Sequence, residues 1–356
     1  MKKKFDLDDF VIPPSIWTNI SSRKEINIYD SNNFLPLFTA PMFDVISDYN
    51  INIFKENKIY PIIPRKKEGE FTNLLNIYLK NKKEFDITEF LSVGLEEFKN
   101  FIDNNTNINL KLFDIKLKIL IDIANGHMKD LELTIKKSKK IFGNNLILMV
   151  GNIAHPQTFF NLSEAGADFV RVSIGNGSSC LTAQQTAINY PLASLLYEIS
   201  EMKNKNKKYA KIIADGGLKK YSDIIKALYL GADYCMLGGI LNKSLESSSD
   251  IYLWNKIKIN QKIASLLFKH KFKLYKRFRG MSTKSAQKQM GKNNLKTSEG
   301  TIKSNLVEYT LPQWKENFEH YLKSSMSYTD STNLSEFKNN NSIIFITKNS
   351  QERFKK

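Results

Sequence analysis

Eight short apolar segments, separated by stretches that read as helices, predict a single-domain α/β fold for this chain of 356 residues, a (β/α)8 barrel. The segments begin mostly about 22 to 32 residues apart, which leaves room for a strand, a loop and a covering helix. They are nearly continuous in apolar character, as strands buried on both faces are. Eight such units favour a closed barrel over an open sheet. The expected strands are Leu35–Met42, Lys58–Ile63, Phe90–Val93, Lys118–Ile123, Leu146–Val150, Asp168–Ile174, Lys211–Ala214 and Tyr234–Leu237.

The segment Met128–Phe142 illustrates the helices expected between these strands. Met128, Leu131, Ile135 and Phe142 fall on one face of a helix, lysines occupy much of the other face, and Gly143 ends it. After the eighth strand we expect a helical region near Asp250–Phe268, a mobile basic flap at about 269–300 and a C-terminal extension at about 301–356. We assign all of these to the same domain.

The composition excludes several classes of protein. With 42% hydrophobic and 12% aromatic residues, the chain can bury a core and is neither disordered nor fibrous. No apolar run approaches the ~20 residues needed to cross a bilayer, and the first ten residues lack an apolar signal core. We therefore expect a cytoplasmic protein that is neither secreted nor membrane-bound. Its two cysteines cannot form a disulfide framework, so we expect free thiols in a reducing compartment.

The net charge of +17, from 53 Lys and Arg against 36 Asp and Glu, has two explanations. One is a nucleic-acid partner. The other is a general richness in Lys, Asn and Ile, combined with a basic loop that meets an anionic ligand. Ten basic residues and no acidic residue lie between Lys269 and Lys296, whereas both signs mix elsewhere. We favour the second explanation and do not expect nucleic acid.

Glycine-rich loops and one cysteine follow the expected strands. The loops that follow parallel barrel strands share one end of the barrel, which is where barrel enzymes have their active sites. The loop after the sixth strand is the longest, because about 43 residues separate the starts of the sixth and seventh strands. The loops concerned are Asp122–His127, Gly151–His155, Gly175–Thr182, Asp215–Gly217 and Gly238–Gly239.

The glycines after the last two strands predict a phosphate site. Barrels often bind a phosphate there, where backbone N–H groups approach the anion because no side chain intervenes. Gly216, Gly217, Gly238 and Gly239 meet that requirement, although glycines also serve tight turns. Asp215 begins the same loop, and we expect it to bind the two hydroxyls of a sugar or, alternatively, to cap the next turn.

Cys180 lies in a glycine-rich loop directly before an expected helix. Free cysteines are usually buried small hydrophobic residues, but the N-terminus of a helix stabilises a thiolate, so we interpret Cys180 as a nucleophile. Cys235 lies within an apolar run, so we interpret it as a buried small hydrophobic residue. Thr182 is a candidate for helix capping as well as for catalysis. We expect His127 and His155 at the same end of the barrel, and no residue spacing indicates a metal bound by side chains.

Five short motifs occur in order along the chain. They are Gly175-x-Gly-Ser-x-Cys180-x-Thr182, Ile213-Ala-Asp-Gly-Gly217, Met236-Leu-Gly-Gly239, Arg279-Gly-Met-Ser282 and Ser298-Glu-Gly300. In this order they resemble the motifs of the IMP dehydrogenase/GMP reductase family. The resemblance runs nearly end to end, because Phe5–Pro13, Ser22-Arg23 and Ser325–Thr329 look like the family's terminal signatures.

Within the family, the sequence is more similar to the reductases. Asp122-Ile-Ala-Asn-Gly126 has the reductase form, and the CBS-type regulatory domain of most dehydrogenases is absent between the second and fourth strands. Only 18 positions separate Met281 from Glu299, a short flap without the Arg-Tyr pair that activates water in the dehydrogenases. A dehydrogenase must hydrolyse its covalent intermediate, whereas a reductase expels ammonia and accepts hydride.

The resemblance implies an NADPH-dependent reduction of GMP to IMP through a covalent adduct between Cys180 and purine carbon 2. It implies that Thr182 and Glu299 protonate the leaving ammonia. The remaining implied roles are phosphate binding by Ser178, Gly217, Gly238 and Gly239, ribose binding by Asp215, base binding by Gly280, Met281 and Ser282, and cofactor binding by Asp122, Asn125, Gly126, Lys296 and the basic flap. It also implies a homotetramer and a potassium ion on the backbone carbonyls of Gly175, Gly177 and Cys180.

The sequence departs from the family pattern at several positions. Arg65 takes the place of the catalytic lysine, and since an Arg does not release its proton near neutral pH, proton transfer there is in doubt. The other departures are Phe43 and Asp44 in the Met-Asp-Thr-Val motif, His155 for a Thr, Leu181 and Ala183 beside Thr182, and Lys296 for an Arg.

Several alternatives stay open. A dehydrogenase without its regulatory domain would oxidise IMP to XMP with NAD, and an inactive barrel would only bind purine nucleotide or, through residues 269–296, nucleic acid. NADH is also open as the reductant.

Overall fold

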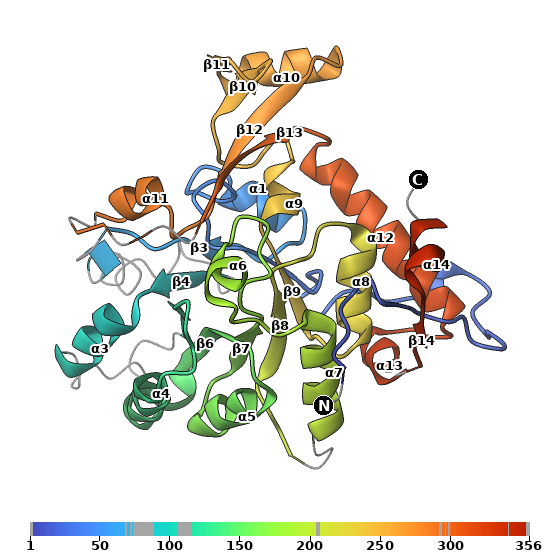
Figure 1. Ribbon diagram of the computed structural model, residues 1–356, viewed down its shortest axis with the longest axis horizontal. Coiled ribbons are helices and arrows are strands. Elements are labelled where there is room, and N and C mark those ends of the chain that lie inside the picture. The colour runs from blue at the N-terminus through green and yellow to red at the C-terminus, as the bar shows by residue number, and fades with distance from the viewer. Residues whose placement is uncertain are drawn as a thin grey trace.

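The computed structural model describes residues 3–67, 70–71, 73, 89–104, 116–203, 207–291, 294–295, 297, 300–340 and 342–353. Eight parallel strands form one sheet in the order β2-β9-β8-β7-β6-β5-β4-β3 (Figure 1). All eight expected strands are confirmed. They are β2 (Leu37–Thr39), β3 (Ile62–Ile63), β4 (Phe90–Val93), β5 (Leu117–Asp122), β6 (Leu146–Ile153), β7 (Phe169–Val172), β8 (Lys211–Asp215) and β9 (Tyr234–Leu237).

The sheet closes on itself where β2 meets the residues before β3. Phe38 forms a parallel bridge with Tyr60. The Tyr60 N–H donates to the Leu37 carbonyl at 3.0 Å, and the Thr39 N–H donates to the Tyr60 carbonyl at 2.9 Å. With helices covering the outside, the predicted (β/α)8 barrel is confirmed.

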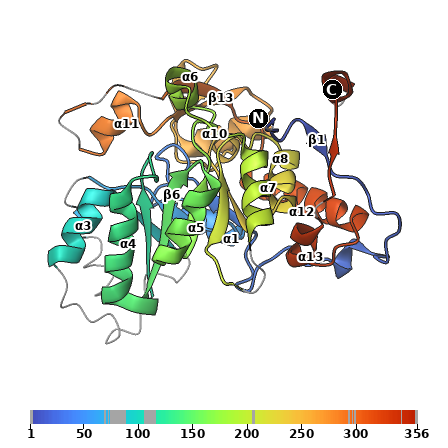
Figure 2. The same ribbon diagram turned by 60° about the horizontal axis from the view of Figure 1, so that its bottom comes forward.

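Helices surround the sheet (Figure 2). Helix α4 (Lys129–Phe142) begins one residue after the expected start and ends at Gly143, which adopts a positive φ of 56°. Leu131, Ile135 and Phe142 are buried as expected, whereas Met128 is 38% exposed. The other outer helices are α1 (Ile51–Glu56), α3 (Leu95–Asn104), α5 (Pro156–Ala165), α7 (Leu192–Met202), α8 (Tyr221–Tyr229) and α12 (Leu311–Tyr328).

Aromatic rings fill the interior of the barrel. Phe38 stacks on Tyr60 with ring centroids 5.0 Å apart, and Phe169 meets Phe38 edge to face at 6.1 Å. Phe90 in turn packs edge to face on Phe169 at 5.6 Å. Because side chains occupy the interior, the barrel is a packed core, and space for a ligand is found at its end.

A second, four-stranded antiparallel sheet stands on the barrel, in the order β11-β10-β12-β13 (Figure 1). The first half of the helical region expected near Asp250–Phe268 is therefore wrong. That half forms a hairpin, whose turn residues Trp254 and Asn255 have φ values of 50° and 61°. The elements are β10 (Ile251–Leu253), β11 (Ile257–Ile259), α10 (Gln261–Lys269), β12 (Leu274–Arg279), α11 (Lys284–Gln289) and β13 (Ile302–Leu306).

Two cations of the basic stretch, Lys276 and Arg279, are engaged inside the protein, whereas Arg277 is exposed. The fully buried Lys276 ammonium donates to the Leu245 carbonyl at 2.8 Å and to the Ser247 carbonyl and hydroxyl at 2.5 and 2.9 Å. Burial lowers the pKa of Lys276 to about 7. The Arg277 guanidinium lies 4.8 Å from the Tyr252 ring centroid, and Arg279 pairs with a buried carboxylate. Lys276 and Arg279 therefore hold the small sheet in place rather than meet an anion, and for the exposed Arg277 the expectation stays a prediction.

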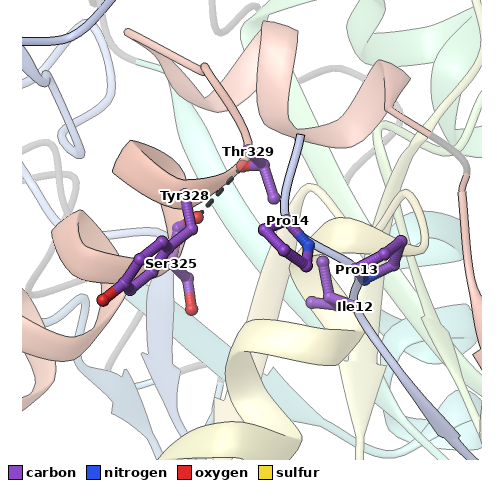
Figure 3. A pocket seen from close by; sticks show the side chains of 6 residues that line it. All are labelled: Ile12, Pro13, Pro14, Ser325, Tyr328 and Thr329. Carbon is purple, nitrogen blue, oxygen red and sulfur yellow. Dashed lines mark hydrogen bonds between the residues drawn. The ribbon is translucent and has the colours of Figure 1, made fainter. Parts of the chain in front are cut away.

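Two segments near the ends of the chain pair with each other. Strand β1 (Phe10–Val11) pairs with β14 (Ile344–Phe345), and the Ser15 N–H donates to the Tyr328 carbonyl at the end of α12. Here the two terminal signatures enclose a cavity of about 290 Å³ without a charged side chain, lined by Ile12, Pro13, Pro14, Ser325, Tyr328 and Thr329 (Figure 3). The remaining elements are η1 (Arg23–Glu25), η3 (Gly143–Asn145), α6 (Thr182–Thr186), α9 (Gly239–Asn242), α13 (Leu334–Asn339) and α14 (Lys348–Arg353).

Candidate active site

A cavity of about 1070 Å³ lies at the C-terminal ends of the barrel strands. In a closed sheet of eight strands, β5 and β9 lie four positions apart, so the loops after them face each other across the barrel, with β7 on the wall between. The predicted residues that line the cavity are Asp122, Asn125, Gly175, Gly177, Ser178, Cys180, Thr182, Asp215, Gly217, Gly238, Gly239, Gly280, Met281 and Ser282.

Among the described residues, one predicted residue, Gly126, does not line the cavity. Gly126 is buried, and its N–H donates to the Asn152 carbonyl at 2.8 Å. A Cβ on Gly126 would lie 2.7 Å from that oxygen, so this glycine lets the loops after β5 and β6 approach each other. Lys296 and Glu299 lie outside the described residues.

Cys180 lies in the loop after β7, partly exposed on the cavity wall. Its thiol donates to the Thr182 hydroxyl, with Sγ and Oγ1 3.3 Å apart. Thr182 is the first residue of helix α6, and the residue before it, Leu181, is the N-cap and makes no side-chain cap. The interpretation of Thr182 as a capping residue is therefore wrong, and its hydroxyl faces the thiol.

The small sheet holds the Cys180 loop from the other side. The Thr301 N–H donates to the Ser179 carbonyl at 3.0 Å, and the Gly280 N–H donates to the Thr301 carbonyl at 3.1 Å. Cys180 also forms an antiparallel bridge with Gly300. A Cβ on Gly280 would lie 2.8 Å from the Ser179 carbonyl oxygen, so three backbone segments meet too closely for a side chain.

A buried arginine connects two of the predicted carboxylates. Arg171 donates from Nη1 to Asp122 Oδ1 at 2.6 Å, and from Nη2 and Nε to Asp215 Oδ2 at 2.8 and 3.1 Å. The Asn152 amide donates to the same Asp215 oxygen at 2.7 Å. Asp215 is therefore held by a charge and an amide, and it does not cap the following turn.

These three residues lie just beyond the apolar interior, toward the C-terminal ends of their strands. Each of them comes two positions after a residue of the same strand that points into the barrel, and side chains two positions apart on a strand point the same way. The pairs are Leu120 and Asp122, Phe169 and Arg171, and Ile213 and Asp215. Sequence reasoning missed Arg171, and the available signal was a charged residue inside the otherwise apolar strand Phe169–Val172.

The charge on Asp122 is balanced from two sides. Burial alone would raise the pKa of Asp122, but the positive charges of Arg171 and Arg65 outweigh it and hold this pKa below its usual range. Arg65 Nε lies 3.7 Å from Asp122 Oδ2, and Nη2 donates to the Asp122 carbonyl. Arg65, at the position of the family lysine, is thus a fixed positive charge on the cavity wall.

The glycines after β8 and β9 present bare backbone to the cavity. Gly216 and Gly217 have φ values of 97° and 79°, so their turn itself requires glycine. A Cβ on Gly239 would lie 2.9 Å from the Ser178 hydroxyl oxygen, and one on Gly238 would lie 3.5 Å from the Phe278 ring. Ser178, Gly239 and Phe278 therefore meet at this end of the cavity.

The other candidate residues have structural roles. Cys235 is buried as expected, and burial raises the pKa of its thiol. His155 accepts a hydrogen bond from the Gln157 N–H at 3.1 Å and so caps α5. His127 Nε2 accepts from the Ala154 N–H at 2.9 Å, and burial, assisted by the nearby His155, lowers the pKa of His127.

Two absences hold for the part of the chain that the structure describes. No three His, Cys, Asp or Glu side chains there come together as a metal site. Nor does any described helix have the length and apolar character that a membrane crossing requires.

Departures from the family pattern are accommodated locally. Asp44, one of the changed residues, is buried and pairs through both oxygens with Arg279, the last residue of β12. The Asp44 carboxylate also accepts the Arg279 N–H at 2.7 Å. This pair fastens the small sheet to the loop after β2.

Comparison with known proteins identifies the family of the chain. A sequence profile of the IMP dehydrogenase / GMP reductase domain matches residues 109–354. The GMP reductase of Mesoplasma florum is 27% identical over 352 residues, which cover 97% of this chain and 99% of that protein. The inosine-5'-monophosphate dehydrogenase of Staphylococcus aureus is 32% identical over 252 residues, 68% of this chain and 50% of the dehydrogenase. The chain belongs to the IMP dehydrogenase/GMP reductase family.

Proposed function

We propose that this protein is a GMP reductase, which converts GMP to IMP and ammonia with NADPH as reductant. The observation that carries the proposal is the Cys180 sulfur, 3.3 Å from the Thr182 hydroxyl, on the cavity wall between the loops after β5 and β9. The similarity to the M. florum GMP reductase supports a reductase because it extends over 99% of that protein, whereas the S. aureus dehydrogenase is matched over half its length.

The substrate would lie with its phosphate at the end of the cavity formed by Ser178, Gly217, Gly238 and Gly239. Asp215 would bind the ribose hydroxyls. Its contacts from Arg171 and Asn152 all go to Oδ2, which leaves Oδ1 directed to the sugar in the part of the site that the structure describes. The backbone of Gly280, Met281 and Ser282 would contact the purine base.

The chemistry begins with attack of the Cys180 thiolate on carbon 2 of GMP. A carbon–sulfur bond forms, and the bond to the exocyclic amine breaks once that nitrogen is protonated, so ammonia departs. The Thr182 hydroxyl, next to the sulfur, passes the proton, and we assign Glu299 to the same relay. A bound reduced nicotinamide supplies the hydride that reduces carbon 2. The carbon–sulfur bond then breaks with its electron pair on sulfur, which releases IMP and restores the thiolate.

The side of the cavity formed by the end of β5 and the loop after it fits the nicotinamide group. Asp122 and Asn125 line it and provide acceptors and a donor for a carboxamide. Gly126 shapes this loop from behind, and Lys296 would bind a cofactor phosphate together with the basic flap. Arg65 contributes a positive charge on this side of the cavity.

The potassium ion and the assembly belong to the same proposal. The carbonyls of Gly175, Gly177 and Cys180 would hold the ion and so order the cysteine loop; one of these oxygens, that of Gly177, also accepts the Cys180 N–H at 2.9 Å. We further propose a single-domain homotetramer that acts in the cytoplasm. Activity in potassium compared with sodium chloride, and light scattering, test the first two points.

A dehydrogenase is the second candidate, supported by the 32% identity to the S. aureus enzyme. One assay separates the two, because the absorbance of reduced nicotinamide moves in opposite directions. A reductase consumes NADPH with GMP and releases ammonia, whereas a dehydrogenase forms NADH from IMP and NAD. No change with either pair, and no mass shift at Cys180, would contradict both enzymatic functions.

A further inference from the structure

Lys303 lies on β13 at the end of the cavity formed by Ser178 and Gly239. In the antiparallel pair of β12 and β13, Lys303 is directly opposite Phe278, so the two side chains leave the same face of the sheet. Ring atoms of Phe278 lie 3.5 Å from the Cβ positions of both Gly238 and Gly239. The register therefore directs Lys303 toward these glycines.

One contact fixes the ammonium group of Lys303. Its Nζ donates to the Ser178 carbonyl. An ammonium has three N–H donors, so two others are available to a second acceptor beside Ser178. In the described ranges of the chain, Lys303 forms no ion pair with a carboxylate, whereas Lys243 on the same cavity pairs with Glu308 at 2.7 Å.

We propose that Lys303 binds the 5'-phosphate of the nucleotide and supplies its countercharge. This inference rests on the proposed function. A phosphate monoester carries nearly two negative charges at neutral pH, and glycine N–H groups and a serine hydroxyl offer only partial positive charges. A full charge at the edge of the site compensates for the lost hydration of the phosphate.

The test compares a nucleotide with its nucleoside. Dissociation constants of GMP and guanosine are measured by calorimetry for the natural protein, Lys303→Met, Lys303→Arg and the control Lys273→Met. Lys273 carries the same charge on the small sheet, but it is exposed and does not line the cavity.

We expect Lys303→Met to weaken GMP binding about tenfold to a hundredfold, the range of one hydrogen bond to a charged group, and to leave guanosine binding within about threefold. Lys303→Arg should restore most of the affinity for GMP, and Lys273→Met should change neither ligand. In turnover, the loss should appear in KM rather than in kcat.

Equal losses for GMP and guanosine would mean that Lys303 only orders Ser178, and unchanged binding of both would mean that it does not contact the phosphate. Either result overturns the inference while the proposed function stands. If the natural protein itself binds neither GMP nor IMP, the proposed function fails and the inference fails with it.

Discussion

Arg171 and Asp215 are joined by two hydrogen bonds to one carboxylate oxygen, at 2.8 and 3.1 Å, while the third side of the guanidinium holds Asp122 at 2.6 Å. The two carboxylates come from β5 and β8, so the guanidinium of β7 spans the barrel between them. One residue therefore sets the position of the groups that we assign to the cofactor and to the ribose.

Replacement of Arg171 by Met should destabilise the fold by about 3–5 kcal/mol, because two buried carboxylates lose their cation. Arg171→Lys should retain part of the stability, since a lysine keeps the charge but cannot bind both carboxylates in the same fork geometry. Denaturant unfolding at neutral pH measures both variants.

The loss of folding stability caused by Arg171→Met should also depend on pH. In the natural protein the pKa of Asp122 is lowered, so its stabilising contribution is present above the unfolded-state pKa of about 3.9 and is lost as the pH falls through the folded-state pKa. Without Arg171, burial favours protonated Asp122, and the difference between variant and natural protein should shrink below about pH 4. A difference that stays constant from pH 7 to pH 4 would contradict the carboxylate origin.

Replacement of Cys180 by Ala should abolish turnover and the covalent adduct detected by mass spectrometry, and should leave nucleotide affinity within a few fold. The sulfur is partly exposed on the cavity wall, so its removal empties little of the core. The matched control is Cys235→Ala, which removes the buried thiol of β9. It should keep the adduct and cost about 1–2 kcal/mol of stability. Turnover retained in Cys180→Ala would exclude this residue as the nucleophile.

Replacement of Gly280 by Ala should lower kcat/KM at least tenfold. A Cβ there would lie 2.8 Å from the Ser179 carbonyl oxygen and 3.1 Å from Gly300 Cα, so the backbone beside Cys180 must shift. Gly143→Ala is the control, because its Cβ would meet nothing within 4 Å and the residue, at the end of α4, does not line the cavity. Equal losses in both variants would show that the crowding at Gly280 does not position the thiol.

Lys276→Met should remove one pH dependence of stability. The folded-state pKa of Lys276 is about 7 and the unfolded value is 10.5, so the unfolded chain binds the extra proton between these values. The natural protein should therefore gain stability relative to Lys276→Met as the pH rises from 7 to 10, by roughly a few kcal/mol. Guanidinium unfolding of both proteins at pH 7, 8.5 and 10 gives this difference. Parallel curves would mean that the buried ammonium keeps an ordinary pKa.

The barrel could be predicted from the sequence because its strands are buried on both faces and so appear as nearly continuous apolar runs, such as Leu146–Val150. The hairpin of β10 and β11 was not predicted because its strands, Ile251–Leu253 and Ile257–Ile259, have three residues each, too few for an alternating pattern to stand out beside helix α10. The turn depends on positive φ values at Trp254 and Asn255, and a sequence shows positive φ clearly only at glycine.

The candidate site was predictable where single loops carry it, as at Gly175–Thr182 and Asp215–Gly217. The ion pairs that connect these loops were not predictable, because they join residues that are distant in the chain. Asp44 and Arg279 are 235 positions apart, and Arg171 and Asp215 are 44 apart. The burial of Lys276 was also not predictable. A lysine in a basic stretch is expected at the surface, and this one is fully buried.

The bridge between Cys180 and Gly300 can form only late in the synthesis of the chain. The last barrel strand ends at Leu237, 63 positions before Gly300, so a growing chain has every strand of the barrel available well before the backbone that flanks the thiol is made. Because chains fold progressively from the N-terminus during synthesis, the barrel strands can pair before this backbone is available. Thr182 lies beside the sulfur from the start, whereas Gly300 joins it only when the last fifth of these 356 residues is made.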